Sequence, residues 1–242
     1  MKILIVGATG ATGKRLVKEL LNYGCDVKVI VRTAEKFSKK IRYHKNISII
    51  TSTILGMSEG ELAKHIEDCD AIVSCLGHNM NFHGIFGHPR RLVADSIHLL
   101  CQAIHTNNLT KPPVKVILMN TAGCRNNDLK EKISFPQLCL IMLLRILVPP
   151  HVDNEKAANY LRTMIGQNHS GIEWVAVRPD SLTEDNTVST YTVHASPNRS
   201  IFNPGKSSRI NVAHFMAELI SDSSTWSEWK GQMPVIYNSE KQ

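Results

Sequence analysis

Three glycines spaced three residues apart follow the first apolar run of the chain without a linker. The run Lys2–Val6 reads KILIV, and the stretch GATGATG after it holds Gly7, Gly10 and Gly13. A strand that turns at once into a helix brings backbone N–H groups to the helix N-terminus, where they bind a pyrophosphate. Gly7 permits the tight turn, Gly10 the close approach of phosphate and Gly13 the packing of the helix on the sheet.

The spacing GxxGxxG differs slightly from the GxGxxG of the simplest dinucleotide fingerprint. Its position between a strand and a helix, in a chain of alternating strands and helices, nevertheless predicts a dinucleotide-binding loop. We expect this loop to contribute these residues to cofactor binding: Gly7, Thr9, Gly10, Ala11, Thr12 and Gly13.

Short apolar runs alternate with longer segments of helical periodicity along the first 180 residues. The expected strands are Lys2–Val6, Val27–Arg32, Ile47–Thr51, Ala71–Leu76, Val114–Asn120 and Glu173–Arg178. The expected helices are Thr12–Tyr23, Glu59–Glu67, Arg90–Asn107 and Asn154–Gln167. Continuous Val/Ile/Leu runs are typical of a sheet covered on both faces. The pattern predicts the α/β class, with a Rossmann-type doubly wound parallel sheet.

The alternation loosens after Pro179. A short alternating run Tyr191–His194, a helix near Val212–Ile220 and a last strand Val235–Asn238 follow. Without a linker or a repeat, we expect residues 1–242 to form a single NAD(P)-binding domain, in which residues 180–242 contribute a small substrate-side C-terminal lobe.

The segment Leu138–Val148 is strongly apolar, but Arg145 interrupts it and Pro136 and Pro149 bound it. It is too short to span a bilayer, so it is expected to be a core helix or a lid over a pocket. No segment gives about 18 uninterrupted apolar residues, and no secretory signal opens the chain, so we expect a cytoplasmic protein without a membrane span.

Composition constrains the partners. The six cysteines lack CxxC spacing in a chain of 242 residues, which favours reduced thiols over disulfides. The net charge of +7 suits a phosphorylated cofactor or an anionic substrate, and the scattered Lys and Arg residues do not favour a nucleic-acid partner. The histidines show no metal-binding spacing, so no metal is expected.

The residues at the end of the second strand indicate whether the ribose of the cofactor carries a 2′-hydroxyl or a 2′-phosphate. An acid there binds the 2′-hydroxyl of NAD, whereas an arginine accommodates the 2′-phosphate of NADP. Here Val27–Arg32 ends in arginine, Lys36 follows a turn later, and the first acid is Glu35. We therefore expect NADP(H), bound through Arg32 and Lys36.

Several motifs together resemble the atypical short-chain dehydrogenase/reductases of the NAD(P)H-binding, NmrA-like kind. They are the glycine loop, Val31-Arg32, Cys75-Leu76-Gly77 and Trp174–Pro179. The tail, with Tyr191-Thr192-Val193 and Ser208–Met216, is similar to the biliverdin reductase B (flavin reductase) branch. The resemblance covers nearly the whole chain and implies additional cofactor contacts at Thr53, Leu76, Gly77 and Pro179.

The chain departs from this family at the catalytic positions. Val152 stands where typical members have the tyrosine of Tyr-x-x-x-Lys, with Lys156 as the lysine. By the resemblance, Thr121 takes the place of a serine near the nicotinamide, and Ser181 that of a substrate-side histidine. His78 lies at the carboxyl end of a strand, where ligands bind in such sheets, and is a second catalytic candidate.

A further departure is Ser52-Thr53-Ile54, where the family usually has Gly-Asp-Val with an acid near the adenine. Thr53 retains hydrogen-bonding capacity without the charge.

Two functions fit these residues. One is an NADPH-dependent oxidoreductase that delivers hydride to a planar small-molecule acceptor, such as a flavin, quinone or tetrapyrrole. The alternative is a non-catalytic NADP(H)-binding redox-sensing regulator of the NmrA-like kind. RNA binding is supported only by the net charge. A monomer or a homodimer is expected.

Overall fold

A computed structural model describes residues 1–79, 81–107 and 112–239. Over these residues, one sheet has the strand order β3-β2-β1-β4-β5-β6-β10-β8. Its strands are β1 (Lys2–Val6), β2 (Asp26–Val31), β3 (Ile47–Thr51), β4 (Ala71–Ser74), β5 (Val114–Met119), β6 (Ile172–Pro179), β8 (Tyr191–His194) and β10 (Val235–Asn238). All pair in parallel except β8, which runs antiparallel to β10. The predicted Rossmann-type α/β fold is confirmed.

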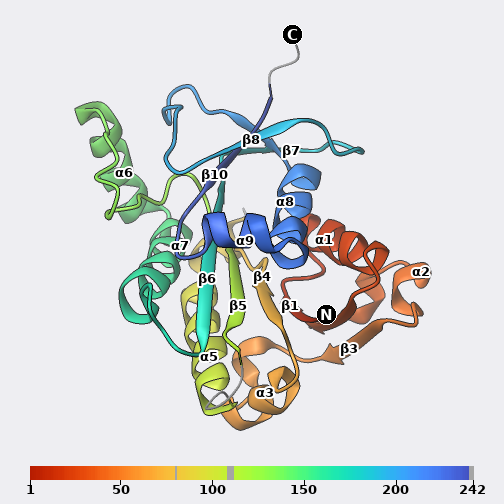
Figure 1. Cartoon of the computed structure of the whole chain (residues 1–242). Coiled ribbons are helices and arrows are strands. Elements are labelled where there is room, and N and C mark those ends of the chain that lie inside the picture. Colours follow the sequence, from red (N-terminus) through yellow and green to blue (C-terminus); the bar gives the residue numbers. More distant parts are fainter. Residues whose placement is uncertain (80, 108–111, 240–242) are drawn as a thin grey trace.

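Helices cover both faces of the sheet (Figure 1). On one face lie α1 (Ala11–Asn22), α8 (Arg209–Ser221) and α9 (Ser223–Trp229), and on the other lie α3 (Glu59–Ile66), α5 (Leu92–Asn107) and α7 (Pro149–Tyr160). Ile3 and Ile5 of β1 belong to the first core, whereas Leu4 and Val6 belong to the second. This alternation explains why buried parallel strands are continuously apolar.

The predicted strands agree with the structure to within two residues at each end, whereas α8 begins three residues before the predicted Val212 and another helix differs more. The sequence predicts a helix over Asn154–Gln167, whereas α7 begins at Pro149 and passes at Tyr160 into a π-helical turn, Leu161–Ile165. Proline is well suited to the first turn of a helix because the N–H that it lacks has no partner there. The prolines therefore start this helix instead of preceding it.

Several short elements have no counterpart in the sequence prediction. They are the 3₁₀ turns Ala34–Lys36 and Ile54–Gly56, the helices α2 (Lys39–Arg42), α4 (Phe82–Phe86) and α9, and the paired strands β7 (Ser181–Thr183) and β9 (Lys206–Ser208). Elements of three to seven residues are too short to show a hydrophobic period.

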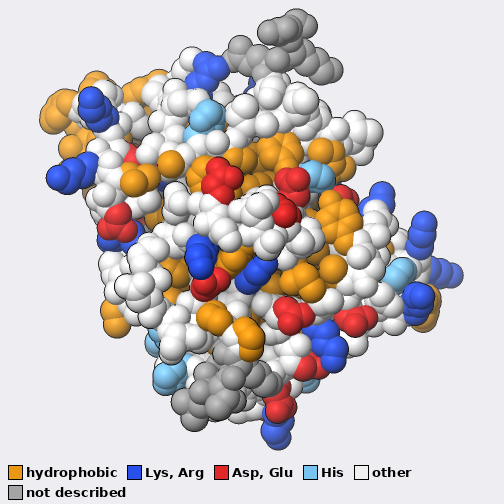
Figure 2. All heavy atoms as spheres, viewed as in Figure 1, with side chains coloured by type: hydrophobic (Ala, Val, Ile, Leu, Met, Phe, Trp, Pro, Cys, Tyr) orange, Lys and Arg blue, Asp and Glu red, His pale blue; other side chains and the backbone are white. Residues whose placement is uncertain are grey.

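The apolar segment forms α6 (Phe135–Leu147), which projects from one side of the molecule (Figure 1). Ile141 is its one buried residue, and Ile146 is 76% exposed. The core-helix alternative is therefore wrong, because α6 is apolar around its circumference and turns only one side toward the protein. Hydrophobic and basic side chains lie together on this part of the surface (Figure 2).

No single helix within the described residues is long and apolar enough to cross a membrane. Helix α6 and the segment Pro149–Ile165 meet the length and composition criteria only as a pair, and they are bent by 105° relative to each other.

Candidate functional site

The three glycines of the first loop meet different neighbours. Gly7 has a φ of +73°, and a Cβ there would lie 2.5 Å from the carbonyl oxygen of Cys75. A Cβ on Gly13 would lie 2.9 Å from the Cα of Ala8. At Gly10, by contrast, a Cβ would meet only the carbonyl oxygen of Gly7, at 3.2 Å. Gly7 and Gly13 are thus required by backbone packing, whereas Gly10 is exposed.

The N-terminus of α1 is left open for an anion. Gly10 is its N-cap, no side chain caps the helix, and its first turn holds no acid. The N–H groups at this end therefore keep the unpaired donors and partial positive charge that suit a pyrophosphate. Thr9 is half-buried and Ala11 exposed beside them, while the buried Thr12 Oγ1 has no hydrogen-bond partner among the described residues. The loop fits a dinucleotide.

The ends of neighbouring strands complete this edge of the sheet. The backbone of Cys75 and Leu76 passes against Gly7, and the space around Gly77 is open to 4 Å. Arg32, at the end of β2, and Lys36, in the turn after it, are both exposed. The acid nearest to them in the sequence is Glu35. Its carboxylate lies 3.7 Å from the guanidinium of Arg42, which offsets its negative charge. The adjoining Thr53 is also exposed, before the 3₁₀ turn that follows β3.

Thr121 lies at the end of β5 in a loop that is fixed by hydrogen bonds. The buried Asn120 accepts the Thr121 N–H at 2.8 Å and donates to the carbonyl oxygen of Asn154 at 3.0 Å. The Thr121 hydroxyl accepts the N–H of Gly123 at 3.3 Å. Ala122 donates its N–H to the carbonyl oxygen of the buried Pro179 at 2.9 Å, which joins the ends of β5 and β6.

The side chain of His78 is only 5% exposed. Its Nε2 lies 2.7 Å from Asp153 Oδ2, and its Nδ1 lies 3.1 Å from the carbonyl oxygen of Gly84. Asp153 also accepts the N–H groups of Val93 and Ala94, near the start of α5. Both nitrogens of His78 are thus occupied, and the residue ties the loop after β4 to α5 and α7.

A cavity of about 320 Å³ opens beside Ala122 and Gly123. Its other walls come from Arg125, residues 129–133, Gln137 and Ile141 of α6, and residues 196, 197 and 199–201. Asp180 also lines it, accepts the N–H of Gly205 at 2.9 Å, and has a pKa that burial raises above its usual value. The adjacent Ser181 is exposed on β7, and it is Asp180 that contributes to the cavity wall.

A buried ion pair holds the loops around this cavity. The fully buried Arg178 donates to Glu131 Oε1 at 2.7 Å and to the carbonyl oxygens of Cys124 and Ala195 at 2.8 and 3.1 Å. Glu131 also accepts the N–H of Asn126 at 2.8 Å. Arg178 therefore links β6 to both the 124–131 loop and the segment after β8.

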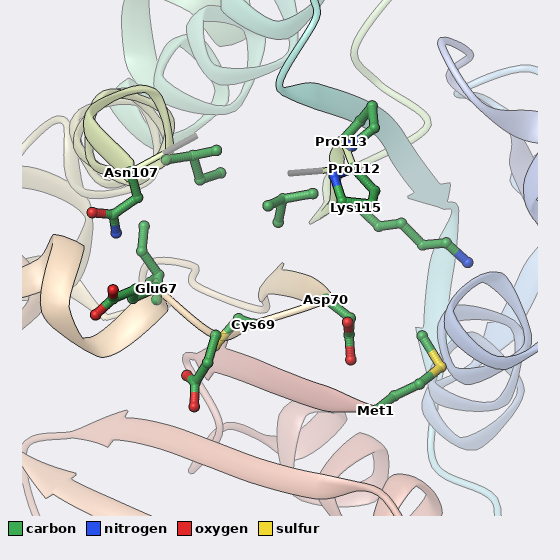
Figure 3. Close-up of a pocket in the computed structure, with 12 residues that line it drawn as sticks. Met1, Glu67, Cys69, Asp70, Asn107, Pro112, Pro113 and Lys115 are labelled. Atoms are coloured by element: carbon green, nitrogen blue, oxygen red, sulfur yellow. The ribbon is translucent and has the colours of Figure 1, made fainter. Parts of the chain in front are cut away.

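A second cavity lies at the opposite edge of the sheet (Figure 3). Met1, Asp70 and Lys115 line it at the amino ends of β1, β4 and β5. Lys115 donates to the carbonyl oxygen of Ile220 at 3.0 Å, and Asp70 accepts the N–H of Lys2 at 2.7 Å. The first contact joins β5 to α8, and the second joins β1 to the residue before β4. The cavity is remote from the glycine loop.

The described residues contain no group of three or more His, Cys, Asp or Glu side chains that could hold a metal ion. The cysteines within them are free, and burial raises the pKa of the Cys75 and Cys101 thiols to about 12.

Comparison with known proteins identifies the class. The chain belongs to the NAD(P)H-binding family, whose pattern matches residues 7–223. This match confirms the resemblance to atypical short-chain dehydrogenase/reductases and supports a nicotinamide cofactor. An uncharacterised chloroplastic protein of Arabidopsis thaliana is 28% identical over 230 residues, which are 93% of this chain and 74% of that protein.

Solved structures share the fold. The oxidoreductase ylbE of Lactococcus lactis superposes with a TM-score of 0.70 at 19% identity, over 100% of this chain and 92% of that one. A short-chain dehydrogenase/reductase of Veillonella parvula in complex with NADP gives 0.70 at 16% identity, over 98% and 94% of the chains. A proposed NADH-flavin reductase of Streptococcus pneumoniae gives 0.68 at 16% identity, over 99% and 100%.

Sequence reasoning missed the polar residues that support this edge: Asn120, Glu131, His151, Asp153 and Glu155. A usable signal was present in the stretch His151–Glu155, where three charged or titratable side chains stand in the first turns of a helix. Glu131 had no such signal in the sequence. Its partner, Arg178, is 47 positions further along the chain.

Proposed function

We propose that the chain is an NADPH-dependent oxidoreductase that delivers hydride to a planar acceptor, such as a flavin, quinone or tetrapyrrole. One observation carries the proposal: the open glycine loop, Thr121 and the cavity beside Gly123 lie at the carboxyl edge of one parallel sheet. In such sheets cofactor and substrate meet at this edge.

The residues take the following roles in this proposal. The GATGATG loop binds the pyrophosphate, with Gly10 as the point of closest approach and Thr9, Ala11 and Thr12 around it. Arg32 and Lys36 bind the 2′-phosphate, Thr53 lies toward the adenine, and Leu76, Gly77 and Pro179 border the nicotinamide half. The bound nicotinamide supplies the hydride.

The protein's contribution to the chemistry is mainly orientation and exclusion of water. Thr121 orients the carboxamide or the acceptor through its hydroxyl, and the buried contacts of His78 position the loop that borders the site. Residues 180–242 supply the substrate side of a single domain, since Asp180 and residues 196, 197 and 199–201 line the cavity and Ser181 follows Asp180.

A non-catalytic NADP(H)-binding regulator remains the second candidate. Val152 occupies the position of the catalytic tyrosine and is consistent with this alternative as well. Acceptor-dependent turnover separates the two candidates, because a regulator binds the cofactor without consuming it.

We expect the protein to bind NADP(H) at least about tenfold more tightly than NAD(H). Each charge-assisted bond to a 2′-phosphate contributes roughly 1.5 to 3 kcal/mol, and Arg32 and Lys36 are both available for one. Calorimetric titration of both cofactors measures the preference, with Arg32→Ala expected to reduce it. Lys64→Ala, on the exposed side of α3, serves as the control. Equal affinities for the two cofactors would contradict the assignment.

Thr121→Val is expected to lower the rate of acceptor reduction moderately. Because the hydroxyl orients and does not supply the proton, the loss should be smaller than the roughly 10²- to 10⁴-fold loss typical of a missing general acid. Stopped-flow measurement of NADPH oxidation with excess FMN gives this rate for both proteins. A loss above about 10³-fold would make Thr121 essential to the chemistry itself.

A further inference from the structure

An imidazole faces Thr121 across Gly123. A Cβ at Gly123 would lie 3.3 Å from Cε1 and 3.7 Å from Nδ1 of His151, and 3.7 Å from the hydroxyl oxygen of Thr121. The imidazole therefore packs directly against Gly123, beside the hydroxyl of Thr121, and a side chain at this position would crowd the ring. Gly123 also lines the cavity, so His151 lies directly behind a residue of the wall of the proposed acceptor site.

The other side of the same imidazole faces a carboxylate. His151 Nε2 lies 3.4 Å from Glu155 Oε1, one helical turn further along α7, and the two side chains are 9% and 13% exposed. Nε2 is buried and forms no well-aligned hydrogen bond with a described residue. Glu155 thus lies on the Nε2 side of the ring, whereas the Cε1–Nδ1 edge borders Gly123.

Glu155 is kept ionised by its surroundings. Burial raises the pKa of this carboxyl group, but His151 and Arg145 outweigh burial and lower the pKa to about 2. Arg145, on α6, donates from Nε and from Nη2 at 2.9 Å each. A two-point contact of this kind fixes the carboxylate as well as stabilising its charge.

We propose that His151 is the proton donor of the reaction, in place of the absent tyrosine, and that Glu155 and Arg145 position it. This inference rests on the proposed function, because it requires an acceptor at the site. The geometry resembles that of other enzymes in which a carboxylate orients a histidine from one ring nitrogen while the other exchanges a proton with the substrate.

The step balances without another reactant. The acceptor gains two electrons and a hydrogen as hydride from the reduced nicotinamide, which leaves as the oxidised cofactor. The acceptor atom that becomes basic takes a proton from Nδ1 of the His151 imidazolium. The neutral imidazole then takes a proton from water, so each turnover consumes one NADPH, one acceptor and one proton.

Asp180 is the rival donor, since it lines the same cavity and burial raises its pKa. Its carboxylate is engaged by the N–H groups of Gly205 and Ser181, which favour the charged form. We therefore assign it to holding the cavity wall, and Asp180→Asn is expected to have a smaller effect on the rate than substitution of His151.

The test uses the full chain with NADPH and two probes, FMN and menadione. His151→Asn preserves a polar group near the Nδ1 position but cannot release a proton, and should lower kcat by roughly 10²-fold or more. NADPH affinity should stay within about twofold of wild type, because the proposal gives His151 a role in proton donation and none in cofactor binding. His98→Asn, at an exposed position on α5, is the matched control and should leave kcat unchanged.

Two further variants distinguish loss of proton donation from a purely structural effect. His151→Ala should regain part of its lost rate when imidazole is added, because imidazolium from solution can enter the vacated space and donate the proton. Glu155→Gln should reduce kcat less than His151→Asn does, since it disturbs only the orientation of the ring.

The outcomes are distinguishable. If the wild-type protein does not oxidise NADPH with either of the two acceptors, the proposed function fails, and this inference fails with it. If wild type turns over and His151→Asn retains its rate to within about threefold, far short of the loss expected for a general acid, only this inference is overturned. A rate loss that imidazole does not restore and that accompanies lost NADPH binding also overturns it, because the ring would then serve the fold.

Discussion

Gly10→Val is expected to abolish NADP(H) binding and to leave a folded chain. The backbone at this position has φ −71° and ψ 168°, which any residue adopts, and the position is exposed. A branched side chain there would occupy the space that the pyrophosphate needs at the N-terminus of α1. Cofactor titration together with circular dichroism measures both parts of the expectation.

Two other glycine-to-valine substitutions serve as controls for Gly10→Val. Gly60→Val, at an exposed position of α3 with no atom within 4 Å of its Cβ, should leave cofactor affinity unchanged. Gly13→Val should fail to fold correctly, because its Cβ would collide with the backbone of Ala8. Retained NADP(H) binding in folded Gly10→Val would mean that the loop does not hold phosphate.

Glu131→Ala is expected to lower the free energy of unfolding by roughly 3 to 5 kcal/mol, because it leaves the fully buried Arg178 guanidinium without its counter-ion. The loop that Glu131 anchors through the N–H of Asn126 should loosen as well. Urea unfolding monitored by fluorescence gives the change directly.

Lys230→Gln is the matched control for this measurement. It breaks an ion pair with Glu173 in which the two side chains are 48% and 30% exposed. Ion pairs at such positions contribute about 0 to 1 kcal/mol. If Glu131→Ala lowered the free energy of unfolding no more than this control does, the ion pair between Arg178 and Glu131 would not be what holds the loops around the cavity.

The sequence predicted those parts of the fold that depend on local pattern. The strand Lys2–Val6 was placed correctly because a buried parallel strand is a continuous apolar run with a sharp end. Helix α6 was harder, since an apolar segment of this length has the same pattern whether it is buried or projects from the surface. Only the tertiary structure distinguishes the two.

In the candidate site, too, the features that depend on local sequence could be predicted, and those that depend on long-range contacts could not. The glycine loop could be interpreted from seven consecutive residues, because strand, turn and helix N-terminus are contiguous. His78 could be placed at the end of a strand, but its buried contact with Asp153 joins residues 75 positions apart. The pair Glu131 and Arg178 is hidden for the same reason. Long-range polar pairing leaves no periodic trace in one sequence.

The most direct test of the proposed function is the oxidation of NADPH by the wild-type protein under anaerobic conditions, with FMN or menadione as acceptor. We predict acceptor-dependent loss of NADPH absorbance that is proportional to protein concentration and weaker with NADH. Tight binding of NADPH without oxidation, in the presence of flavins, quinones and biliverdin alike, would contradict the account and identify the chain as a cofactor-binding regulator.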